Sequence, residues 1–211
     1  MRHYKRDMTL DESLKKFDTL KVLIHTVDNL LSVRAQVEGA DSLGNLAFQN
    51  RSLFEAMISS MRYFDLRVLY PNTLWTSLFL TGYALFENTL DELSDYFAEK
   101  KRTALLPKDL NYKGIKRSIV FLTKVAVVSF PETSLYLEKI QKTNKIRNCL
   151  AHGGKIGNYS KPEEIKALLD NDNKHLAEKN DYLVLSKEYV VEFFDHCRFF
   201  LKETSDQIFS E

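Results

Sequence analysis

Apolar residues recur every three or four positions along the first third of the chain, which is the period of an amphipathic helix. A first stripe predicts a helix over residues 11–37, with apolar positions at Leu14, Phe17, Leu20, Ile24, Val27 and Leu31. We expect the segment 39–44, which contains two glycines, to end that helix. A second stripe begins at Leu53 and predicts a helix that ends near Tyr70, because Pro71 lacks the backbone N–H that a helix interior needs.

Similar stripes predict that the rest of the chain is also built from helices. The expected helices cover residues 72–100, 112–129, 132–151 and 162–176, followed by a last helix that begins after Ser186. We expect Gly153 and Gly154 to stop the third of these abruptly, and Ser186 to cap the last one. The apolar run Tyr182–Leu185 predicts one short strand.

Turn-forming residues are scarce, with 7 glycines and 4 prolines in 211 residues. This scarcity argues against β-sandwiches and barrels, which need such residues at every turn between short strands. We therefore predict an all-α fold. Residues 1–70 would form an N-terminal helical pair packed on a helical bundle of residues 72–211.

No apolar stretch approaches the ~18 residues that a membrane span needs, and no apolar run follows the charged first residues as in a signal peptide. The sequence therefore predicts a soluble, cytoplasmic protein without a membrane partner. Cys149 and Cys197 lack the paired spacing of a zinc site, and a chain of this length does not require a disulfide. We expect both to be small, buried apolar side chains.

Charge is unevenly distributed along the chain, although its net value is only +1. The segment 110–162 contains ten basic and two acidic residues and carries +8, so the remainder carries −7. A block of one sign can attract a polyanion such as RNA. Alternatively, these lysines simply solvate the outer faces of helices.

One polar cluster stands at the predicted end of the helix over residues 132–151. Asn148 and His152 are four residues apart and share a helix face, which the long side chain of Arg147 can reach from its flank. The negative pole of the helix favours a protonated imidazole at His152, which can exchange a proton near neutral pH. Arg147 offers a forked charge to a phosphate, and Asn148 can orient either neighbour. In the alternative interpretation, His152 caps the last helix carbonyls and Arg147 is solvated.

Two residues of the preceding apolar helix are candidates to support this cluster. Glu87 needs a partner if it is buried, and Arg147 or Asn148 could serve; it could equally be exposed where that helix becomes acidic. Tyr83 lies one turn earlier and could join the site or fill the core. The sequence contains no Gly-rich phosphate loop, no His-Glu-x-x-His pattern and no Gly-x-Ser-x-Gly elbow, so we expect no cofactor and no metal.

The pattern Arg147-Asn148-x-x-x-His152 resembles the Arg-x(4–6)-His motif of the HEPN superfamily, in which a polar residue, often Asn, follows the Arg. Three further segments resemble that family, namely Tyr83–Glu87, Lys113–Arg117 and Leu183–Val190. The resemblance covers residues 72–205 and leaves residues 1–70 unexplained. It implies a HEPN-like helical bundle that acts as a homodimer.

The resemblance also implies a function, that of a metal-independent endoribonuclease whose site is shared across the homodimer interface. Carried over, His152 would serve as general acid or base, Arg147 would stabilise the charged phosphorane, and Asn148 would position them. Such cleavage leaves a 2′,3′-cyclic phosphate. RNA would bind through lysines of the basic block, Lys142, Lys145 and Lys155.

Such a protein could be a toxin or an antiviral defence effector, with an antitoxin or another defence protein as its partner. Members paired with nucleotidyltransferase antitoxins carry a Tyr two residues after the His, where this chain has Gly154; this excludes nucleotidylation of a tyrosine at that position. Two rival interpretations stand beside this one. The first is a non-catalytic HEPN-like module that holds RNA, a nucleotide or a protein, and the second is a helical interaction domain whose motif is coincidental.

Overall fold

The first helix is longer than its sequence predicts. The computed structural model describes residues 2–47, 53–126, 134–171 and 174–210, and α1 (Arg2–Ala47) is one unbroken helix. The predicted end at residues 39–44 is therefore wrong. Glycine serves close packing here, because a Cβ at Gly39 would lie 3.3 Å from Cε2 of Tyr63 on the next helix. Such packing offsets the cost of about 1 kcal/mol that a glycine imposes inside a helix.

The next helical run passes straight through Pro71. It consists of α2 (Leu53–Phe64), the π-helix η1 (Asp65–Leu69) and α3 (Tyr70–Lys101), which follow one another without a break. The predicted helix end near Tyr70 and the predicted start at Asn72 are therefore wrong. In the π-turn, the N–H of Tyr70 donates to the carbonyl of Asp65, five residues back. Pro71, which has no N–H, thus stands where the α-helical bonding is already shifted. The division into two units stays a prediction, and its boundary lies inside this run.

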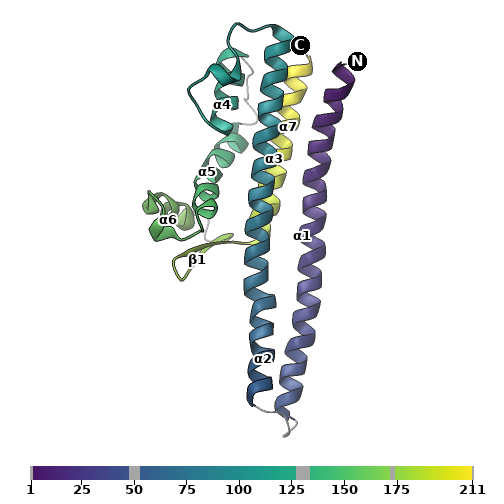
Figure 1. Cartoon of the computed structure of the whole chain (residues 1–211), viewed down its shortest axis with the longest axis vertical. Coiled ribbons are helices and arrows are strands. Elements are labelled where there is room, and N and C mark those ends of the chain that lie inside the picture. The colour runs from purple at the N-terminus through teal and green to yellow at the C-terminus, as the bar shows by residue number, and fades with distance from the viewer. Residues whose placement is uncertain (1, 48–52, 127–133, 172–173, 211) are drawn as a thin grey trace.

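Three long helices, α1, α3 and α7 (Lys187–Ser210), run side by side along the molecule (Figure 1). Phe17 of α1 faces Phe194 of α7 with ring centroids 5.7 Å apart. α3 approaches the same ring so closely that a Cβ at Gly82 would lie 2.1 Å from Cε1 of Phe194. Ion pairs also join α1 to α7, among them Lys187–Asp28 at 2.7 Å, Lys21–Asp195 at 2.5 Å and Arg198–Asp18 at 3.3 Å. The N-terminal helix is thus packed along α3 and α7.

A group of shorter elements packs against the opposite side of α3 and α7 (Figure 1). Its helices are α4 (Ile115–Val120), the π-helix η3 (Phe121–Val125), α5 (Ser134–Ala151) and α6 (Pro162–Asn171), with 3-10 turns η2 (Pro107–Asp109) and η4 (Ile156–Asn158). The helix predicted over 112–129 begins at Ile115 and becomes a π-turn; residues 127–129 of that prediction lie outside the described residues. The helix predicted over 162–176 ends early, at Asn171.

A β-hairpin follows α6. Its strands, β1 (Leu176–Lys179) and β2 (Tyr182–Leu185), pair antiparallel. The predicted strand at 182–185 is confirmed, whereas its partner was not predicted. Asn180 and Asp181 form the two-residue turn with φ of 52° and 68°, the left-handed conformation that type I′ hairpin turns require and that Asn and Asp tolerate.

The chain is mostly helical, as predicted. Ser186 caps α7, because its Oγ accepts a hydrogen bond of 3.1 Å from the backbone N–H of Tyr189. Cys149 and Cys197 are both buried and unbonded, as expected. No helix within the described ranges combines the length and the apolar character needed to cross a membrane.

Candidate functional site

The motif residues lie at the C-terminal end of α5, which closes in a Schellman turn. The N–H of Gly154 donates to the carbonyl of Cys149 at 2.9 Å, and the N–H of Gly153 donates to the carbonyl of Leu150 at 3.1 Å. Gly153 has a φ of 93°, which a residue with a side chain rarely adopts. The predicted stop at these glycines is confirmed, and His152 is the C-cap residue.

The His152 side chain is exposed. Its backbone N–H, not its imidazole, interacts with the helix end, with carbonyls of Asn148 and Cys149 at 3.3 and 3.2 Å. No residue that the structure describes forms a hydrogen bond or an ion pair with the imidazole. The imidazole is therefore open to a ligand, at the helix end whose partial negative charge attracts a cation.

His152 and Asn148 line the same pocket of about 420 Å³, as their four-residue spacing predicts. The other lining residues are Cys149, Lys155, Asn158, Tyr159 and Ser160. The last three are not predicted from the sequence, although a polar run after the two glycines is a signal for a loop that folds back over the helix end.

Asp181, from the hairpin turn, holds this loop in place. Its carbonyl accepts from the N–H of Ile156 at 2.7 Å, and its Oδ1 accepts from the N–H of Gly157 at 3.1 Å. The carbonyl of Gly154 accepts in turn from the N–H of Leu183 at 2.8 Å. The pocket wall is thus an extension of the hairpin, positioned by residues distant in sequence.

Arg147 lies beside the pocket and does not line it. Its Nη1 donates to Oδ1 of Asn148 at 3.0 Å, and its guanidinium carbon stands 5.5 Å from the centroid of the Tyr83 ring. Asn148 therefore connects Arg147 to the pocket that Asn148 and His152 both line. The amide of Asn148 and the aromatic face of Tyr83 together orient the guanidinium group.

Tyr83 supports Arg147 from α3. Its buried ring stacks on Phe193 with centroids 6.0 Å apart, and its hydroxyl donates to Oδ1 of Asn144 at 3.0 Å. Burial, and then the charge of Glu87, raise the pKa of the Tyr83 phenol well above its ordinary value. The hydroxyl therefore remains protonated and can donate but not act as a base. Asn144 is not predicted from the sequence, although it precedes Asn148 by one helical turn.

Glu87 does not join the motif directly. Within the described part of the chain it forms no hydrogen bond or ion pair with Arg147 or Asn148, the two partners considered from the sequence. Its half-buried side chain lies at the start of α4, where a Cβ at Gly114 would be 3.2 Å from its Oε1. Its charge acts on the neighbouring Tyr83, whose pKa it raises.

The three lysines expected to bind RNA each face a carboxylate. The pairs are Lys142–Glu138 at 2.7 Å, Lys145–Glu164 at 3.0 Å and Lys155–Asp181 at 4.0 Å. Of the three, Lys155 lines the pocket of His152, whereas Lys142 lines a different cavity. The structure thus brings one of these lysines to the motif. Acidic neighbours offset part of the positive charge that the sequence concentrates in segment 110–162.

Over residues 2–47, 53–126, 134–171 and 174–210, no group of three or more His, Cys, Asp or Glu side chains is arranged to hold a metal ion. Comparison with models of known families, with curated proteins and with solved structures finds no match for this chain.

Proposed function

We propose that this chain is a HEPN-type, metal-independent endoribonuclease that acts as a cytoplasmic homodimer. The observation that carries the proposal is the convergence at the end of α5: His152 and Asn148 line one pocket, and Arg147 is bonded to Asn148. An exposed imidazole, an amide and a guanidinium are the groups needed for proton transfer, for orientation and for stabilising a charged phosphorane.

Cleavage would use the ribose of the RNA itself as the nucleophile. His152 removes the proton of the 2′-hydroxyl, and the 2′-oxygen attacks the adjacent phosphorus. Arg147 stabilises the charge on the phosphorane. The bond to the 5′-oxygen then breaks, and this oxygen takes a proton from an imidazole. The products are a 2′,3′-cyclic phosphate and a 5′-hydroxyl end.

The separation of Arg147 from the pocket supports a site shared by two protomers. Arg147 contacts Tyr83 and Asn148 of its own chain and lies outside the pocket that His152 lines. In a two-fold dimer in which the ends of two α5 helices meet, Arg147 of one chain would reach the pocket that His152 of the other chain lines.

We propose that Lys155, which lines the pocket, contacts the RNA backbone first. Lys145 and Lys142, which lie on α5, would make further contacts. Their ion pairs are partly exposed to water, and pairs of this kind are weak, so phosphates can compete for the lysines. Affinity for RNA should fall as salt is raised. We further propose a role as a toxin or antiviral effector held in check by a protein partner.

The proposal is tested by incubating the chain with single-stranded RNA in EDTA and analysing the ends of the products. We expect cleavage to persist in EDTA and to leave 2′,3′-cyclic phosphates. His152→Ala should lose the proton transfer, a factor of about 10²–10⁴ in rate. The matched control is His25→Ala, which changes an exposed histidine of α1. A substrate with a 2′-deoxy sugar at the cleaved position should not react, and its cleavage would refute the mechanism.

The second candidate function is a HEPN-like module that binds RNA without cutting it. The observation in its favour is that the guanidinium of Arg147 is already engaged by Tyr83 and Asn148, as a purely structural arginine would be. If the wild-type chain binds RNA in a salt-dependent manner and produces no cyclic phosphate, this second function replaces the first.

A further inference from the structure

A second cavity, of about 460 Å³, lies between α5, α6, β1 and α7. It shares no lining residue with the pocket of His152. Its volume falls in the range of sites that hold small organic molecules. Of its lining residues, the proposed function uses Lys142 alone, as a contact for the RNA backbone.

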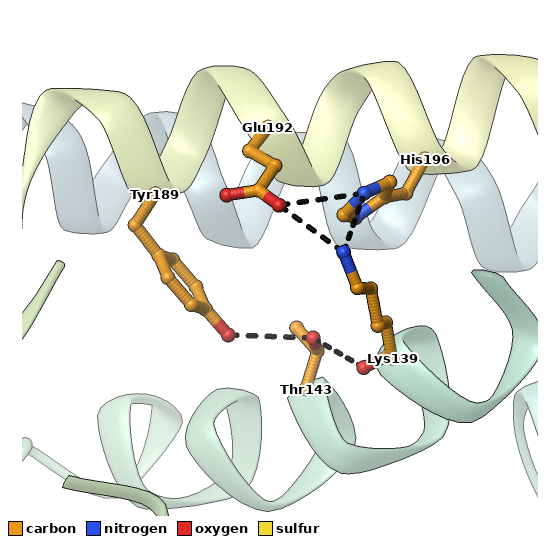
Figure 2. Close-up of polar contacts among 5 residues, drawn as sticks. All are labelled: Lys139, Thr143, Tyr189, Glu192 and His196. Carbon is orange, nitrogen blue, oxygen red and sulfur yellow. Dashed lines mark hydrogen bonds and ion pairs between the residues drawn. The ribbon is translucent and has the colours of Figure 1, made fainter. Parts of the chain in front are cut away.

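The floor of this cavity is apolar. Ile146 of α5, Leu176 of β1 and Phe193 of α7 are buried and contribute to the lining. Two hydroxyls also belong to the lining: Oγ1 of Thr143 lies 3.3 Å from the hydroxyl of Tyr189 and donates to the carbonyl of Lys139 at 2.9 Å (Figure 2). An organic molecule with an apolar or aromatic body would find both dispersion contacts and hydrogen-bonding groups here.

A charged cluster stands beside these hydroxyls (Figure 2). Nζ of Lys139 lies 3.3 Å from Oε1 of Glu192 and 3.4 Å from Nε2 of His196, which in turn is 3.5 Å from the same carboxylate oxygen. Burial, and then the charge of Lys139, lower the pKa of His196. The imidazole is therefore neutral at pH 7.

The charges around the cavity are unbalanced in favour of cations. Its described lining contains three lysines, Lys139, Lys142 and Lys174, and one carboxylate, that of Glu192. Lys142 is also paired with Glu138 at 2.7 Å, so with that carboxylate included and both histidines left out these groups carry +1. The lysines lie on two sides, since Lys139 and Lys142 belong to α5 and Lys174 precedes β1. An anion between them would be attracted from both sides.

We propose that this cavity binds a small organic phosphate monoester with an apolar or aromatic body. A phosphate monoester carries about −1.5 to −2 at pH 7, so it is attracted by the excess of positive charge, and it accepts hydrogen bonds from the lysine ammonium groups. The apolar floor takes the body of the molecule. Glu192 opposes binding, because it holds Lys139 and repels the ligand.

The proposal is tested by calorimetric titration of the full chain with 1-naphthyl phosphate, a dianion with an aromatic body. We expect a dissociation constant below about 1 mM. Inorganic phosphate lacks the body and 1-naphthol lacks the charge, so each should bind more weakly. Absence of binding by 1-naphthyl phosphate, or equal binding by 1-naphthol, would overturn the proposal.

Charge variants locate the site and give effects of opposite sign. Glu192→Gln removes the opposing carboxylate and should tighten binding by about threefold or more, which loss of a merely structural contact would not do. Lys174→Glu should weaken binding. Lys166→Glu, at an exposed lysine of α6 outside the cavity, and Lys155→Glu, in the pocket of His152, should leave it unchanged. Unchanged or weaker binding by a folded Glu192→Gln variant would overturn the proposal.

Discussion

The guanidinium carbon of Arg147 lies 5.5 Å from the centroid of the Tyr83 ring. This contact joins α5 to α3 at the motif. Tyr83 is itself fixed, because its ring stacks on Phe193 of α7 and its hydroxyl is bonded to Asn144. The position of the arginine is thus set by three helices and not by the local turn alone.

Replacing Tyr83 by Phe should distinguish the contribution of the aromatic ring from that of the hydroxyl. The variant loses the bond to Asn144, which should lower the free energy of unfolding by about 1 kcal/mol. It keeps the aromatic face beneath Arg147, and the raised pKa of the phenol already prevents it from acting as a base. We therefore expect RNA cleavage within about threefold of wild type. Loss of cleavage in a stably folded Tyr83→Phe variant would instead assign the hydroxyl a direct part in the reaction.

Mixing two inactive variants tests whether the site is shared between protomers. If each site takes Arg147 from one chain and His152 from the other, a heterodimer of Arg147→Ala with His152→Ala contains one intact site. Random assortment should then restore about a quarter of the wild-type cleavage rate. Light scattering of the same samples reports the oligomeric state. A monomer, or a dimer without any restored activity, would place both residues in a site within one chain.

The glycine at the end of α5 offers a test of the turn that presents His152. A Cβ at Gly153 would meet no atom within 4 Å, so the cost of a substitution comes from its φ of 93° alone. Gly153→Ala should lower the free energy of unfolding by about 1–2 kcal/mol, measured by urea denaturation. Gly153→Asn should cost less, because Asn tolerates left-handed backbone better. Equal stabilities for Ala and Asn would contradict this explanation.

Acidification should destabilise the protein through His196. Burial and the charge of Lys139 lower its pKa in the folded state, and they outweigh the opposite influence of Glu192 and Asp195. As pH falls below the ordinary value of 6.5, the unfolded chain therefore binds a proton that the folded chain does not. The free energy of unfolding should decrease over that range, and His196→Gln should reduce the dependence. His25→Gln, at an exposed histidine, is the control, and an equal effect of both variants would count against the prediction.

Local chemistry accounts for the elements that the sequence predicts well. Gly153 can adopt the left-handed backbone that ends α5, and Ser186 can bond the N–H of Tyr189 that opens α7. Neither depends on distant residues. The shared pocket of Asn148 and His152 follows in the same way from their spacing on one helix.

Other features depend on contacts between distant segments. Gly39 does not end α1, because Tyr63 packs against it from another helix. Residues 176–179 form a strand only through pairing with 182–185. The wall of the candidate site is likewise fixed by Asp181, more than twenty residues beyond the loop that it holds. Neither periodicity nor motif spacing reveals such pairings.

The π-turn at η1 determines how α2 is rotated about the helix axis relative to α3. It contains one residue more than the same stretch of α-helix would. Each residue of an α-helix adds a rotation of about 100° about the helix axis. Deleting one residue between Asp65 and Leu69 would restore regular bonding and rotate α2 by that angle. A different face of α2 would then meet α1. The one extra residue of η1 therefore determines which face of α2 packs against α1.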